Sequence, residues 1–125
     1  MSPLLLDTHA LLWSVGDTDR LSSTARDILS AGEALAYVSA ASIWEIAIKR
    51  ASGKLKVPDN LLEMVAMARF IELEVSFEHG ATAGALPPHH RDPFDRMLVA
   101  QAQIEGLTIV TSDARVAAYD VPVLW

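Results

Sequence analysis

The sequence contains no cysteine, few aromatic residues and no long apolar run. The lack of cysteine excludes disulfide bridges and thiolate metal sites, so a metal ion would be bound by oxygen or by histidine. No apolar stretch approaches the roughly 20 residues that a membrane-spanning helix needs. The N-terminal stretch MSPLLLDTH also lacks the basic lead of a signal peptide. Together these absences predict a cytoplasmic protein that spans no membrane.

Positive charge is also scarce. There are 10 Lys and Arg residues against 16 Asp and Glu residues, which gives a formal net charge of −6. Such a charge argues against a protein that coats nucleic acid by bulk electrostatics. It still allows a nuclease whose acidic residues surround cations, because bound divalent ions reverse the local charge. With 51% hydrophobic and 21% charged residues, the chain is predicted to form one globular domain over residues 1–125.

Short apolar runs alternate with segments of helical spacing. We predict strands at residues 3–7, 34–39, 71–75, 107–113 and 121–125. Helices are expected at residues 9–15, from Ser22 or Ser23 to 31, from Ser39 or Ser42 to 53, and at 60–70, 79–85 and 94–105. The uniformly apolar PLLL, ALAYV and LTIV are typical of strands that are covered on both faces. The alternation therefore predicts an α/β fold with a parallel sheet between layers of helices.

Two of these predicted strands end in a carboxylate. Asp7 follows PLLL, and Asp113 follows LTIVTS. In parallel sheets ligands bind beyond the carboxyl ends of the strands, where the strand order reverses. Each Asp could equally be a helix N-cap or a turn residue. Thr111 and Ser112 add hydroxyl groups that could bond to a neighbouring carboxylate or to a water on a metal ion.

Glu45 lies in the segment SIWEIAI, which is apolar on nearly every side and predicts a largely buried helix. A buried unpaired charge is costly, so this carboxylate needs a partner. Lys49, one turn later, is one candidate, but such a pair is worth only about 0.2–0.5 kcal/mol on an exposed face. We therefore favour a metal ion, or a water bound to it, as the partner of Glu45.

Asp92 and Asp95 begin the last long helix in the stretch DPFDRMLVAQA. Pro93 suits the first helical turn, which makes Asp92 the natural N-cap. Asp95 is one turn further on and is free to point toward the strand ends. We select Asp95 for the site and keep Asp92 as the alternative.

Asp7, Glu45, Asp95 and Asp113, hereafter the acidic quartet, come from four different elements that can converge on one crevice. Four carboxylates in one place repel and cannot all ionise without compensation. Hard oxygen ligands are what Mg²⁺ and Mn²⁺ prefer. Such ions activate water and stabilise an in-line phosphoryl displacement. The quartet therefore predicts metal-dependent hydrolysis of a phosphodiester.

Basic residues stand beside this predicted site. His89, His90 and Arg91 could contact phosphate, but we favour a solvated loop, because two prolines precede them. Arg96 directly follows Asp95. It could orient a carboxylate, contact the substrate or make an ordinary ion pair.

Four blocks of the sequence resemble the PIN-domain family, and more closely its VapC-type toxin ribonucleases of type II toxin–antitoxin systems. The blocks are LLLDTHALLW, VSAASIWEIAIKRASGKL, HRDPFDRMLVAQA and GLTIVTSD. The resemblance covers essentially the whole chain and implies a three-layer α/β/α fold. It also implies an acidic quartet that binds Mg²⁺ or Mn²⁺. By motif, Asp7 and Asp95 are the main ligands, while Glu45 and Asp113 complete the site or act through water.

The same resemblance implies endonucleolytic cleavage of RNA, with arrest of translation as the outcome. It implies a cognate antitoxin as partner, a homodimer as the usual assembly, and hetero-oligomers with the antitoxin.

Two other functions compete with this interpretation. A haloacid-dehalogenase-type phosphatase also begins with a strand that ends in Asp, but it needs an acidic residue where this chain has His9. A PIN-like domain without catalysis, kept only to bind a partner, would be expected to lose acidic positions. The complete quartet therefore favours the nuclease.

Overall fold

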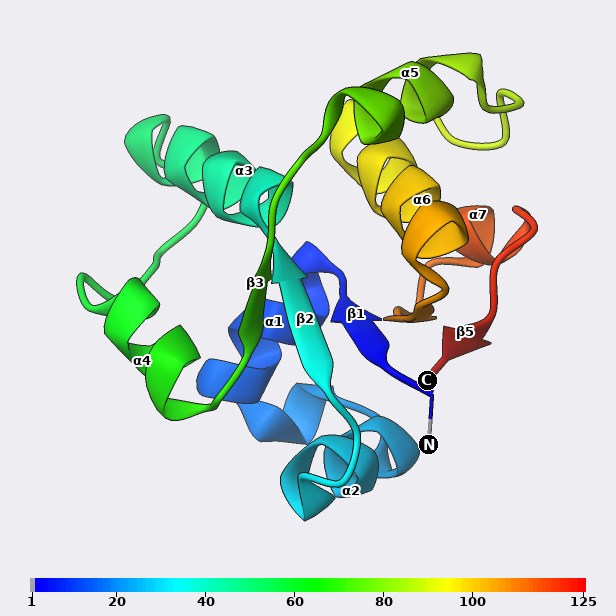
Figure 1. Cartoon of the computed structure of the whole chain (residues 1–125). Coiled ribbons are helices and arrows are strands. Elements are labelled where there is room, and N and C mark those ends of the chain that lie inside the picture. The colour runs from blue at the N-terminus through cyan, green and yellow to red at the C-terminus, as the bar shows by residue number, and fades with distance from the viewer. Residues whose placement is uncertain (1) are drawn as a thin grey trace.

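The computed structural model describes residues 2–125, in which a five-stranded sheet lies between two layers of helices (Figure 1). The strands are β1 (Leu4–Leu6), β2 (Ala36–Ser39), β3 (Ile71–Leu73), β4 (Thr108–Val110) and β5 (Val123–Leu124). The helices are α1 (Thr8–Val15), the 3₁₀ helix η1 (Thr18–Arg20), α2 (Ser23–Ala31), α3 (Ala40–Ala51), α4 (Leu61–Met67), α5 (Phe77–Ala85), α6 (Pro93–Glu105) and α7 (Ala114–Ala117). None of the helices in this described part combines the length and the apolar character that crossing a membrane requires.

All the strands of the sheet are parallel, in the order β3-β2-β1-β4-β5. In the central strand, Leu5 stands opposite Tyr37 of β2 on one side and opposite Ile109 of β4 on the other. The chain runs outward from β1 to β3, then crosses back to β4 and β5, so the strand order reverses between β1 and β4. This confirms the predicted α/β class. It also places the expected binding edge just beyond Leu6 and Val110.

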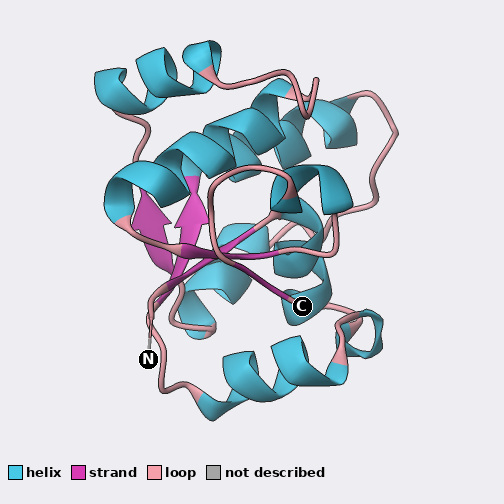
Figure 2. Cartoon of the chain, turned by 90° about the vertical axis from the view of Figure 1, so that its right-hand side faces the viewer, coloured by secondary structure: helices cyan, strands magenta, loops and turns pink. Residues whose placement is uncertain are grey.

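The alternation of side chains along β1 divides the core into two layers. Leu4 and Leu6 pack on one face, in a cluster with residues of α1, α2 and α3. Leu5 packs on the other face, in a cluster with Leu98 and Val99 of α6 and with residues that follow β4. Because β1 is buried on both faces, it needs apolar residues at every position, which explains the unbroken LLL. Figure 2 shows the helices on both sides of the sheet.

Two elements begin at places that the sequence pattern did not predict. Helix α5 begins at Phe77 rather than at residue 79, because Ser76 and His79 form a reciprocal capping box. The Ser76 hydroxyl accepts from the backbone N–H of His79, and Nδ1 of His79 accepts from the backbone N–H of Ser76. Helix α7 was not predicted at all, because its four residues are too short for a periodic pattern.

The predicted end of β2 at Ser39 is confirmed, but those of β3 and β4 were wrong. The hydrogen-bonded part of β3 ends at Leu73 and that of β4 at Val110, two and three residues before the predicted ends. Gly106 ends α6 as predicted, with a φ of 71° that favours glycine. The shorter β4 leaves Thr111, Ser112 and Asp113 beyond the end of the strand, and the side chain of Thr111 contacts Asp7, which follows β1.

The central strand supplies a test of the two-layer core. Leu5 is fully buried between β2, β4 and α6, so Leu5→Ala removes apolar contacts and leaves a cavity. We expect a loss of about 2–5 kcal/mol in the free energy of unfolding, measured by urea denaturation. The matched control is Leu62→Ala on α4, where the side chain is 66% exposed and little stability should be lost. Equal losses in the two variants would contradict the assigned core.

Candidate active site

Two residues of the acidic quartet cap helices at the carboxyl edge of the sheet. Asp7 follows β1, and its Oδ1 accepts from the backbone N–H of Ala10 at 2.7 Å, which caps α1. Asp113 follows β4, and its Oδ1 accepts from the backbone N–H of Arg115 at 2.8 Å, which caps α7. The capping role that we considered for both residues is therefore present. It also fixes the two carboxylates at the point where the strand order reverses.

The structure confirms the predicted N-cap role of Asp92. Oδ1 of Asp92 accepts from the backbone N–H groups of Phe94 and Asp95, so Asp92 caps α6. Asp95 lies in the first turn of that helix, and its side chain is 22% exposed. The cap fixes the start of α6. Asp95, in the first turn, is thereby directed toward the ends of β1 and β4.

Glu45 is buried and has two partners from the protein itself. Its Oε1 accepts from the hydroxyl of Thr8 at 2.5 Å, and its Oε2 pairs with Nζ of Lys49 at 2.5 Å. Lys49, the alternative partner that the sequence offered, is therefore paired with Glu45 in this structure. The Glu45 hydrogen bond raises the pKa of Lys49, and the charges of Asp92 and Asp95 act in the same direction.

His90 is the site residue that the sequence analysis missed. We favoured a solvated loop, but the side chain of His90 is only 3% exposed. Its Nε2 lies 3.0 Å from Oδ2 of Asp113 and 3.1 Å from Oδ2 of Asp95. The available signal was its spacing: His90 stands two residues before the N-cap Asp92, which places its ring beside the start of α6.

The quartet residues fall into two geometric groups. Single ligand atoms of His90, Asp95 and Asp113 all lie within 4.8 Å of one another, which is close enough to surround one ion. Asp7 and Glu45 are outside this tight group, but their charges act on Asp95. All four acidic elements therefore converge on one region, and Asp95 is at its centre.

Charge crowding is strongest at Asp95. Burial and the charge of Asp92 raise its pKa to about 7, with further contributions from Glu45 and Asp7 and opposition from His90. Burial also raises the pKa of Asp7, although the hydroxyl of Thr111 and the backbone N–H of Ala10 lower it in part. The ionised forms of these two carboxylates are therefore disfavoured, because the protein does not fully compensate their charge.

The pKa of Asp113 is shifted in the opposite direction. Burial acts to raise its pKa, but hydrogen bonds from the Arg115 backbone, the His90 ring and the Arg115 side chain outweigh burial and lower it. Asp113 therefore stays ionised next to Asp95. A cation that binds between them would contact the ionised Asp113, and its positive charge would favour ionisation of Asp95.

The supporting residues differ in what they contact. The buried hydroxyl of Thr111 accepts from the backbone N–H of Asp113, while Ser112 is exposed at the strand end. Arg96 donates to the backbone carbonyl of Ala83 in the last turn of α5, at 2.9 Å, and to that of Leu86 just after this helix, at 3.0 Å. Its guanidinium therefore stabilises the loop that carries His90.

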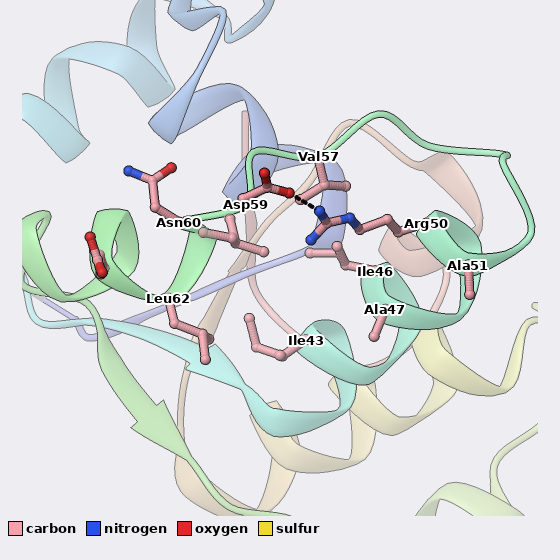
Figure 3. A pocket seen from close by; sticks show the side chains of 11 residues that line it. Ile43, Ile46, Ala47, Arg50, Ala51, Val57, Asp59, Asn60 and Leu62 are labelled. Carbon is pink, nitrogen blue, oxygen red and sulfur yellow. Dashed lines mark hydrogen bonds and ion pairs between the residues drawn. The ribbon is translucent and has the colours of Figure 1, made fainter.

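A separate cavity of about 630 Å³ lies between α3 and α4 (Figure 3). Apolar side chains such as Ile43 and Leu62 line it, and an ion pair between Arg50 and Asp59 crosses it. No residue of the acidic quartet is among its lining residues. The quartet therefore does not share this cavity.

Comparison with solved structures identifies the same fold in several proteins. DNA-bound VapBC from Salmonella typhimurium has a TM-score of 0.73 at 17% identity, with 99% of this chain and 98% of that chain covered. VapBC2 from Rickettsia felis, bound to a promoter DNA fragment, has a TM-score of 0.72 at 14% identity, with coverages of 97% and 96%. Identities this low show the fold alone.

Comparison by sequence is more specific. Ribonuclease VapC22 of Mycobacterium tuberculosis (strain ATCC 25618 / H37Rv) is 32% identical over 127 residues, which span 98% of this chain and 95% of the relative. The family model for the PIN domain matches residues 4–122, a range that includes all four quartet residues. The chain therefore belongs to the PIN-domain family, in which it is similar to the VapC ribonucleases.

Proposed function

We propose that this protein is a divalent-metal-dependent endoribonuclease that acts as the toxin of a toxin–antitoxin pair. The observation that carries the proposal is the convergence of the acidic quartet, from four elements, on the edge where β1 and β4 end. A relative at 32% identity is named a ribonuclease, which supports RNA as the substrate.

The donor set fits Mg²⁺ or Mn²⁺. It consists of carboxylate oxygens, the hard ligands that these ions prefer, and the chain has no thiolate to attract a softer metal. Asp95 and Asp113 would hold the ion together with Asp7, and Glu45 would complete the site through water. When bound, the ion would activate water for attack on phosphorus and stabilise the charge that develops on the phosphoryl oxygens.

The protein's own groups then have distinct tasks. Asp7 and Asp113 are held rigidly by the helix caps, so they keep their positions when substrate enters. Thr8 and Lys49 orient Glu45 from two sides. The side chain of Lys49 is 35% exposed, which lets its ammonium group face an RNA phosphate while it remains paired with Glu45.

A cognate antitoxin is the partner that we propose. The structural relatives include VapBC complexes and a toxin–antitoxin complex from Klebsiella pneumoniae. We further propose a homodimer that associates with the antitoxin into a hetero-oligomer. The alternative function is a PIN-like module that binds a partner without catalysis. The pairing of Glu45 with Thr8 and Lys49, which needs no ion, is the observation that favours it.

The first test is removal of single carboxylates. Asp7→Asn and Asp95→Asn should each slow cleavage of total cellular RNA by at least about 100-fold, because each removes a ligand worth several kcal/mol of transition-state stabilisation. The fold should persist, since Asn can also accept the cap bond at residue 7. Asp27→Asn, exposed on α2, is the matched control and should leave the rate unchanged.

Asp92→Asn distinguishes the two acidic residues of α6. Asn is as good an N-cap as Asp, so this variant should retain most of the cleavage activity. Full activity in Asp95→Asn together with loss in Asp92→Asn would exchange the roles that we assign. Unchanged activity in Asp7→Asn and Asp95→Asn would overturn the proposed site.

The second test is removal of the metal. Excess EDTA should abolish RNA cleavage by the purified protein, and added Mg²⁺ or Mn²⁺ should restore it fully, because the carboxylates are held by helix caps and not by the ion. Discrete RNA fragments analysed by gel electrophoresis provide the readout. Cleavage that persists in EDTA would eliminate the metal mechanism. A folded, metal-loaded protein that cleaves no RNA would favour the binding module.

The third test uses thermal stability and pH in the metal-free protein. The pKa of Asp95 is about 7 in the folded state and near 3.8 when unfolded, so its charge destabilises the fold progressively as the pH rises from about 4 to 7. Asp95→Asn removes this cost. The Tm gain should therefore grow between pH 5 and pH 8, where it should reach at least about 4 °C.

Asp113→Asn is the matched control for this pH series. The pKa of Asp113 is lowered in the folded state, so its charge stabilises the fold at every pH well above 4. The variant should lower the Tm by a similar amount at pH 5 and at pH 8. A Tm gain in Asp95→Asn that does not change with pH would contradict the charge crowding at Asp95.

A further inference from the structure

The proposed nuclease function gives no task to His90, although this residue contacts two carboxylates of the quartet. Its ring is almost fully buried, and its Nε2 faces Asp95 and Asp113 at 3.1 and 3.0 Å. Its other ring nitrogen, Nδ1, accepts from the backbone N–H of Asp92 at 3.1 Å. A buried histidine with a partner on each nitrogen is fixed both in orientation and in tautomer.

The contact with Asp92 decides where the ring proton is. A backbone N–H can only donate, so Nδ1 must offer its lone pair and carries no proton. The hydrogen-bond geometry therefore places the ring proton on Nε2. This N–H donates to Oδ2 of Asp113, and Oδ2 of Asp95 lies beside it.

The backbone of His90 is held as firmly as its ring. Its N–H donates to the hydroxyl of Tyr119 at 2.9 Å, and this hydroxyl donates in turn to the carbonyl of Pro87. Its carbonyl accepts from the guanidinium of Arg96 at 3.3 Å. Every polar group of His90 therefore has a partner, and the ring has no freedom to leave the two carboxylates.

We propose that His90 is a positioning residue, which holds Asp95 and Asp113 in the arrangement that a divalent cation needs without binding the cation itself. The inference rests on the proposed metal site and assigns a residue that acts through the ligands. Hydrogen bonds to ligating carboxylates are a common means of orienting them.

The position of the ring proton argues against His90 as a direct ligand, although Nε2 is close enough to the carboxylates to share an ion with them. A ligand nitrogen needs its lone pair, so the proton would have to move to Nδ1, where it would meet the N–H of Asp92.

The first experiment measures Mn²⁺ affinity of the full chain by calorimetry, in two variants. His90→Asn keeps an acceptor for the Asp92 N–H but cannot reach the carboxylates, and we expect binding to weaken by about 10–100-fold. His90→Gln extends an amide donor toward the position of Nε2 and should recover most of the affinity. His89→Gln is the matched control. His89 is the exposed neighbour, and its change should leave affinity as in the wild type.

Thermal stability is measured on the same samples, because a purely structural histidine would change Tm without this pattern in metal affinity. Loss in His90→Asn with recovery in His90→Gln, at comparable Tm, supports the positioning role. Wild-type affinity in a folded His90→Asn would overturn it.

The second experiment needs no variant. Long-range ¹H–¹⁵N spectra of the histidine rings should place the His90 proton on Nε2 in the metal-free protein and keep it there when Mg²⁺ is added. Loss of this proton on addition of Mg²⁺ would make His90 a ligand and overturn the inference.

The two proposals fail in different ways. A wild-type protein that binds no Mn²⁺ overturns the proposed metal-dependent function. A wild-type protein that binds Mn²⁺ and cleaves RNA, with affinity unchanged in His90→Asn, overturns only the role of His90.

Discussion

The structure depends on the concentration of negative charge at one edge of a buried parallel sheet. Each carboxylate there costs free energy unless something compensates it. The chain uses the starts of its own helices: Asp7, Asp92 and Asp113 cap α1, α6 and α7, so backbone N–H groups and the positive ends of the helix dipoles face the charge. The same contacts fix where these helices begin. Folding the helices and assembling the site are therefore one process.

The protein compensates the charges of the four quartet residues to different extents. The residue that is compensated least indicates where the proposed cation would bind. Glu45 is paired with Lys49 and bonded by Thr8, and Asp113 is bonded by Arg115 and His90. Asp95 has fewer donors among the described residues, and burial and the charge of Asp92 raise its pKa to about 7. Asp95, beside an ionised Asp113, is therefore the carboxylate whose charge a bound cation would compensate most.

The sequence was sufficient to predict those elements that are determined by residues close together in the chain. The apolar runs of β1, β2 and β4, the Asp92 cap with Pro93, and Gly106 at the end of α6 all follow from near neighbours in the chain. The partners of the site residues do not follow from near neighbours in the chain. Thr8 reaches Glu45 across 37 positions and His90 reaches Asp113 across 23, and no periodic pattern records such pairs. A basic loop after two prolines is typical of solvated surface, so burial of His90 could be seen only in three dimensions.

The loop that carries His90 shows why rigidity extends beyond the ligands. Arg96 stands next to Asp95 in sequence, yet its guanidinium turns away to the carbonyls of Ala83, Leu86 and Pro87. By holding these carbonyls it ties the end of α5 to the start of α6. Tyr119, from beyond β4, joins the same network through its hydroxyl. Segments far apart in the chain therefore fix the orientation of one buried ring. Because carboxylates that repel one another will separate unless they are held, this network helps to keep Asp95 and Asp113 as close together as the proposed metal site requires.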